Sequence, residues 1–77
     1  NEWIFHEGSV LSPKSKGPSI LKSEKIFKTV KEAMDECKKN KNCKGVTDDF
    51  KTNKITMRWT DNPKKIDTFI GNSWTKK

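Results

Sequence analysis

The chain has 77 residues and carries 17 lysine and arginine side chains against 10 acidic ones, which leaves a formal net charge of +7. This length suits one domain, residues 1–77, with a small core, because so short a chain buries only about 60% of its unfolded surface. No apolar run approaches the roughly 20 residues of a membrane-spanning helix. The positive charge favours polyanionic partners, although lysine can also serve solubility alone.

The N-terminal residues 3–6 are predicted to form a short aromatic strand. Side chains alternate between the two faces of a strand, so Trp3 and Phe5 share one face, and Ile4 and His6 share the other. The lone histidine has no cysteine or serine nucleophile beside it. We interpret it as a structural or surface residue.

Residues 8–23 are rich in serine, proline and glycine, which is typical of a loop. Two short apolar pairs lie within this stretch, Val10–Leu11 and Ile20–Leu21, and each is interpreted as a short strand or as a plug beneath the loop. Beyond the loop, Ile26–Phe27 predicts an extended segment that leads into a helix. Phe27 is a core candidate.

One amphipathic helix is predicted to begin after Thr29, which can cap it, and Glu32 completes a Thr-x-x-Glu capping box. The apolar residues that follow have the i, i+3, i+4, i+7 spacing of one helix face. They are Val30, Ala33, Met34 and Cys37. Residues 40–42 have poor helix propensity and are expected to end the helix.

The chain has two cysteines, one on the apolar face of this helix and one soon after the helix ends. If the chain turns back onto its helix, Cys37 and Cys43 come within disulfide range, and the short loop would contribute about 2 kcal/mol. The alternative is a pair of free buried thiols in a cytosolic domain. A disulfide favours an extracellular location, and a start at Asn1 without a visible signal peptide is typical of a fragment excised from a longer protein.

Further strands are predicted after the helix. The first begins at Cys43 and runs toward Asp48–Asp49, which we interpret as a solvated strand end, because a calcium site needs a ligand-spaced loop. Residues 54–59 alternate apolar and polar side chains, the pattern of a half-buried strand. Gly71–Asn72 predicts a turn, and Trp74 anchors a last strand. Strands on both sides of one helix predict an α+β domain, with the helix packed on a small antiparallel sheet.

Residues 32–37 (EAMDEC) and residues 42–46 (NCKGV) resemble the helix-to-strand core of PAN/apple-like domains. Residues 54–58 resemble the next strand of that family, and residues 73–76 resemble its closing strand more faintly. The resemblance implies a helix that disulfides pin to an antiparallel sheet, with Cys37–Cys43 as the pair between the helix end and the following strand. It also implies an extracellular adhesion module that binds a protein or a glycan.

The chain departs from the family pattern at a second helix-to-sheet disulfide. The matching positions here are Ala33 and Ile55, whose apolar side chains could replace that bridge by packing. The bridge that joins the termini of longer apple domains is absent as well. The resemblance therefore implies a minimal, single-disulfide version, and the family's ligand sites are not carried over.

Catalysis is not indicated, because the chain has one histidine, no glycine-rich phosphate loop and no dedicated pair of carboxylates among its 10 acidic residues. No cofactor is expected. A structural zinc site needs four ligands, and His6 is the only soft ligand besides the two cysteines. The expected function is therefore binding.

The densest basic run surrounds the helix exit, and residues 61–63 are predicted to turn and leave two more lysines exposed. The candidate anion-binding or glycan-binding residues are Lys38, Lys39, Lys41, Lys44, Lys64 and Lys65. Lys76 and Lys77 extend this set if the fold brings them near. A solvated helix end that complements its own dipole is the alternative interpretation of the run.

Three functions are compatible with these features. The first is an extracellular module that binds a protein or a sulfated glycan through its lysines. The second is a structural interaction module of a larger protein, whose charge serves solubility. The third, a nucleic-acid binder, is disfavoured by the expected disulfide and by the presence of a single arginine. Exposed tryptophan beside the basic run would favour it again, because single strands stack on aromatic rings.

Overall fold

The structure is a computed structural model, and it describes residues 2–11 and 25–77. The predicted apolar pair Ile20–Leu21 lies outside these residues. The elements of the described part are β1 (Trp3–Glu7), β2 (Ser9–Val10), β3 (Ile26–Phe27), α1 (Val30–Lys39), β4 (Gly45–Asp49), β5 (Lys54–Arg58), β6 (Lys64–Lys65) and β7 (Gly71–Lys76).

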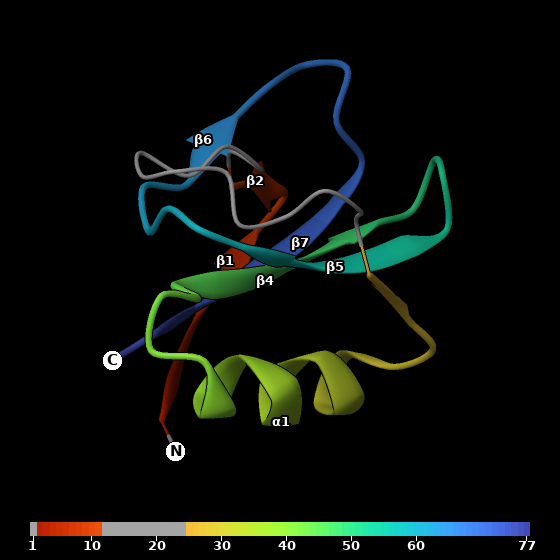
Figure 1. Cartoon of the computed structure of the whole chain (residues 1–77). Coiled ribbons are helices and arrows are strands. Elements are labelled where there is room, and N and C mark those ends of the chain that lie inside the picture. Colours follow the sequence, from red (N-terminus) through yellow and green to blue (C-terminus); the bar gives the residue numbers. More distant parts are fainter. Residues whose placement is uncertain (1, 12–24) are drawn as a thin grey trace.

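Five strands form one sheet in the order β1-β7-β4-β5-β3, and every neighbouring pair is antiparallel. Helix α1 packs on one face of this sheet, against β3, β4 and β5. The ribbon of β2 and β6 lies on the opposite side of the sheet from α1 (Figure 1). The expected α+β arrangement, with one helix on an antiparallel sheet, is therefore confirmed.

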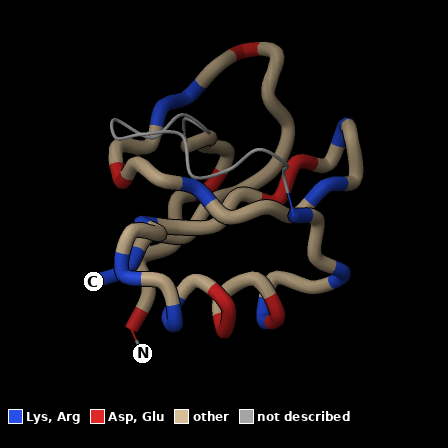
Figure 2. Tube along the Cα trace, in the orientation of Figure 1, with Lys and Arg blue, Asp and Glu red and all other residues tan. Residues whose placement is uncertain are grey.

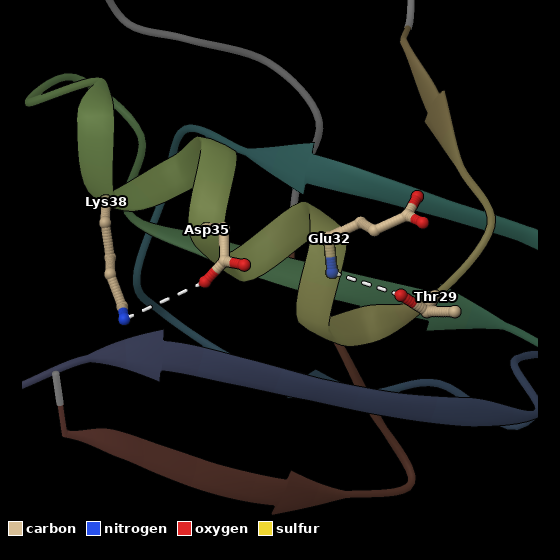
Figure 3. Close-up of polar contacts among 4 residues, drawn as sticks. All are labelled: Thr29, Glu32, Asp35 and Lys38. Carbon is tan, nitrogen blue, oxygen red and sulfur yellow. Dashed lines mark hydrogen bonds and ion pairs between the residues drawn. The ribbon is translucent and has the colours of Figure 1, made fainter.

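Helix α1 begins where the capping pattern predicts. The Glu32 backbone N–H donates to Thr29 Oγ1 at 3.1 Å, which satisfies one of the first N–H groups of the helix (Figure 3). Ala33 and Cys37 of the predicted apolar face are fully buried. At the other end, the Asn40 N–H donates to the carbonyl of Cys37, so the helix stops at the residues with poor helix propensity.

The core lies between α1 and the sheet. It consists of Phe27, Ala33, Cys37, Cys43, Val46 and Trp59, with Trp3, Met34, Ile55 and Met57 partly buried against them. Ala33 and Ile55, the two positions expected to replace a disulfide by packing, both belong to this set. The core is small and depends on large rings, as a short and polar chain requires.

The predicted disulfide is present. Cys37 in the last turn of α1 is bonded to Cys43, just before β4, and both residues are fully buried. The bond ties the end of the helix to the central strand of the sheet.

We expect thiol titration of the unfolded, unreduced protein to find no free thiol. Reduction should lower the free energy of unfolding by about 2 kcal/mol, since the bond closes a short loop. Denaturant unfolding with and without reductant measures this difference, and the double variant Cys37→Ala/Cys43→Ala serves as its genetic counterpart. Two titratable thiols would contradict the disulfide and the expectation of an extracellular location that rests on it.

The other face of the sheet differs from the prediction for residues 54–59. That segment was expected to be half-buried, yet Thr56 and Arg58 on its polar face are buried. They lie beneath the segment of residues 9–11, because Arg58 Nη1 donates to the carbonyl of Leu11 at 2.8 Å and Arg58 Nε donates to Thr56 Oγ1. Arg58 thereby gains hydrogen-bond partners that compensate for its burial.

Hydroxyl groups on the neighbouring strands continue this buried polar layer. Thr47 Oγ1 and Ser73 Oγ lie 2.8 Å apart, and Ser73 Oγ donates to the carbonyl of Ser9 at 2.7 Å. The Leu11 N–H donates to Thr47 Oγ1, and the Leu11 side chain is fully buried. Val10 therefore belongs to a short strand, β2, and Leu11 is a buried plug against the sheet, so each residue fulfils one of the predicted alternatives.

Two predictions for the C-terminal third are wrong. The turn expected at residues 61–63 is absent, while Lys64 and Lys65 are exposed as expected and form β6, which pairs with β2. Gly71–Asn72 is not a turn, because Gly71 begins β7 and pairs with Asp49 of β4. A β-carbon at Gly71 would collide with the carbonyl oxygen of Asp48, so this glycine permits close strand approach.

Candidate functional site

Four of the predicted lysines surround the end of α1. Lys38 and Lys39 lie in its last turn, Lys41 lies in the following turn, and Lys44 follows the disulfide-bonded Cys43. The covalent loop fixes the backbone that carries them. One of these charges is partly neutralised, because Lys38 Nζ lies 3.9 Å from Asp35 Oδ1 at an exposed position (Figure 3).

The last strand adds a fifth lysine to this run. Lys76 Nζ donates to the carbonyl of Asn40 at 3.0 Å, and the Lys76 backbone N–H donates to the carbonyl of Lys44 at 3.1 Å. Burial, and then the neighbouring charge of Lys44, lower the pKa of Lys76. We call the five lysines at this place, Lys38, Lys39, Lys41, Lys44 and Lys76, the basic end.

The basic end can be followed in Figure 2, where blue segments gather around the end of α1 and the C-terminus. Lys77 extends the run but is paired with an acid, because its Nζ lies 3.3 Å from Glu2 Oε2. Lys64 and Lys65 are placed elsewhere: β6 lies on the other side of the sheet from α1 (Figure 1). The six lysines singled out in the sequence therefore do not form one surface.

The acidic pair has a structural place at the end of β4. Asp49 Oδ1 accepts from the backbone N–H groups of Lys51 and Thr52, which stabilises the turn into β5. Burial, and then the charge of Asp49, raise the pKa of Asp48. Within residues 2–11 and 25–77, His, Cys, Asp and Glu side chains form no group of three that could hold a metal ion.

His6 has the structural role that the sequence predicts. Its Nε2 lies 2.8 Å from Thr75 Oγ1, on the face of the sheet opposite α1. The contact joins β1 to β7 and uses one ring nitrogen.

An aromatic group next to the basic end was missed by sequence reasoning. Trp3, Phe5 and Trp74 project from β1 and β7 on the same face as α1, because Phe5 pairs with Trp74, and Trp74 pairs with the core residue Val46. The sequence does predict that Trp3 and Phe5 share a face. Their place beside the lysines depends on the pairing of β1 with β7, for which the sequence carries no local signal.

Helix α1 has ten residues, and the described part of the chain contains no helix with the length and apolarity needed to cross a membrane. No protein-family model, curated protein or solved structure matches this chain.

Proposed function

We propose that this chain is a non-catalytic extracellular binding module, PAN/apple-like in fold, that holds an anionic ligand at its basic end. The ligand is an acidic protein surface or a sulfated glycan. The fold is supported by the helix-to-strand disulfide and by the packing of α1 on an antiparallel sheet, the arrangement that the sequence resemblance implies.

One observation carries the binding proposal. Lys44 and Lys76 are brought together by backbone pairing of adjacent strands, and burial, followed by the like charge of Lys44, lowers the pKa of Lys76. Like charges on these adjacent strands repel each other, and a bound anion would attract both lysines instead. Lys39 and Lys41 at the same end of α1 are exposed and add to the positive field.

A structural role is the second candidate, and a specific contact favours it. The Lys76 ammonium donates to the carbonyl of Asn40 at the C-terminal end of α1, where positive charge complements the helix dipole. On this alternative the lysines stabilise the helix end and keep a spacer module soluble, and no ligand is needed.

Charge reversal at the basic end separates these candidates. We expect the double variant Lys41→Glu/Lys44→Glu to bind a heparin-derived oligosaccharide about tenfold to a hundredfold more weakly than the unmodified chain, at about 1 kcal/mol for each exposed charge. NMR titration at near-physiological salt measures the affinity and should place the shifts at residues 38–44 and at Lys76.

The matched control is Lys64→Glu/Lys65→Glu, which makes the same change in net charge on the opposite side of the sheet. It should weaken binding by less than about threefold, because salt screens exposed charges that lie on the other side of the sheet from the ligand. Equal losses in the two double variants, or scattered shifts that vanish with added salt, would show that the charge is generic and would favour the structural role.

A further inference from the structure

The aromatic group identified above forms a surface beside α1, which we call the aromatic platform: Trp3, Phe5 and Trp74. The Phe5 and Trp74 rings lie 5.4 Å apart between centroids, with their planes inclined at 44°. Trp3 packs in part against the core, whereas Phe5 is 52% exposed. Burying a phenyl ring is normally worth about 2 kcal/mol, so the fold leaves much of this ring's binding potential unused.

The platform is continuous with the basic end. Trp3 is the cross-strand partner of Lys76, and Lys76 pairs through its backbone with Lys44. One row across the sheet therefore reads Trp3, Lys76, Lys44, and the next row reads Phe5, Trp74, Val46. Apolar rings and ammonium groups stand side by side on one face.

The charge reverses at the other end of the platform. In the third row, Glu7 of β1 and Asp48 of β4 are both cross-strand partners of Asn72. A uniformly anionic ligand would meet repulsion there. The ligand that fits this surface thus places its charged groups over the first row and an uncharged, flat portion over the second.

We propose that the aromatic platform and the basic end form one site for a linear polysaccharide that carries sulfate or carboxylate groups, with a sugar ring packed on Phe5 and Trp74. The C–H bonds on one face of a pyranose are weakly positive and suit the negative face of an aromatic ring. The anionic groups of the adjoining sugar then reach Lys76 and Lys44. This inference rests on the proposed function and names its ligand class.

An acidic peptide or a single-stranded nucleic acid fits the same surface less well. A peptide offers charge but no rigid ring with a polarised face for Phe5. Phosphate recognition recruits arginine for its bidentate geometry, and the single arginine of this chain is buried beneath residues 9–11. An anionic glycan combines sugar rings that have a polarised C–H face with sulfate or carboxylate groups, which matches the aromatic row and the basic row.

The test compares two probes on the full chain: a heparin-derived oligosaccharide and a polyaspartate peptide of matched charge. The variant Phe5→Leu keeps an apolar side chain but removes the ring, and Phe5→Trp restores a ring. Ile4→Ala is the matched control, because Ile4 lies on the same strand at 42% exposure and faces the other side of the sheet. Thermal denaturation of each variant verifies that it is folded.

We expect Phe5→Leu to weaken oligosaccharide binding about fivefold to tenfold, with Phe5→Trp and Ile4→Ala within twofold of the unmodified chain, and polyaspartate binding unchanged throughout. Unchanged oligosaccharide binding in Phe5→Leu, while Lys41→Glu/Lys44→Glu still weakens it, would overturn the stacking inference and leave the proposed function intact. Equal weakening of both probes would assign the platform to acidic peptides and overturn the glycan. An unmodified chain that binds neither probe would end both proposals.

Discussion

Replacing Ala33 with lysine is expected to abolish folding. Ala33 is fully buried at the centre of the face that α1 turns toward the sheet, within a core of six residues. An ammonium group placed there has no acidic partner in the core, and burying it unpaired costs several kcal/mol. A domain of this size has about 5–15 kcal/mol of total stability, so the loss is comparable to the whole. Circular dichroism and NMR chemical-shift dispersion report the outcome.

Lys39→Glu is the control on the same helix. Lys39 is exposed in the last turn, where its charge complements the helix dipole, so the variant should lose only about 0.3–1 kcal/mol and remain folded. A folded Ala33→Lys protein of ordinary stability would mean that α1 packs on the sheet through another face.

The elements that the sequence predicts well are those with local causes. The cap at Thr29 and the apolar spacing of Ala33 and Cys37 belong to one continuous stretch, and they specify both where the helix begins and which face is buried. The disulfide follows for the same reason, because the sequence separation of its cysteines is only six residues. Interactions within one short stretch are therefore enough to predict these features.

The features that the sequence does not predict depend on contacts between distant residues. The sequence places Arg58 on the polar face of a half-buried strand. Its burial arises because residues 9–11 cross that face, where the carbonyl of Leu11 accepts a hydrogen bond from Arg58. Gly71 is predicted to lie in a turn, since glycine is common in turns, yet it is the first residue of β7 and pairs closely with Asp49 of β4. The pattern of one segment contains no information about what covers it.

The same difference between local and long-range contacts applies to the candidate site. The lysines at the end of α1 are neighbours in the sequence and were found as a run. Lys76 joins them, and Lys64 and Lys65 leave them, because of strand pairing that brings β7 next to β4 and β6 next to β2. The aromatic platform needs residue 5 beside residue 74. The pairing of β1 with β7 at the edge of the sheet provides this neighbourhood.

Gly45→Ala is expected to destabilise the fold by about 3 kcal/mol or more, although it adds one methyl group. Gly45 begins the central strand β4, and a β-carbon there would lie 2.6 Å from Leu11 Cδ1 and closer still to the carbonyl oxygen of Trp74. Overpacking alone costs about 1–3 kcal/mol, and relief of this contact would also require β7 to move away from β4. The melting temperature should fall by at least about 12 °C, at about 4–8 °C for each kcal/mol.

Gly8→Ala distinguishes this steric effect from the general effect of replacing a glycine. Gly8 has a φ of 65°, but among residues 2–11 and 25–77 a β-carbon there would have no neighbour within 4 Å, so the variant should lose only the roughly 1–2 kcal/mol of a left-handed alanine. A Gly45 variant that is no less stable than the Gly8 variant would show that Leu11 can be displaced cheaply. The buried layer on that face would then be a loose cover, and the bonds from Leu11 to Thr47 and Arg58 would contribute little to the fold. A larger loss at Gly45 means that β7 and residues 9–11 are held tightly against β4, the same constraint that holds Lys76 beside Lys44.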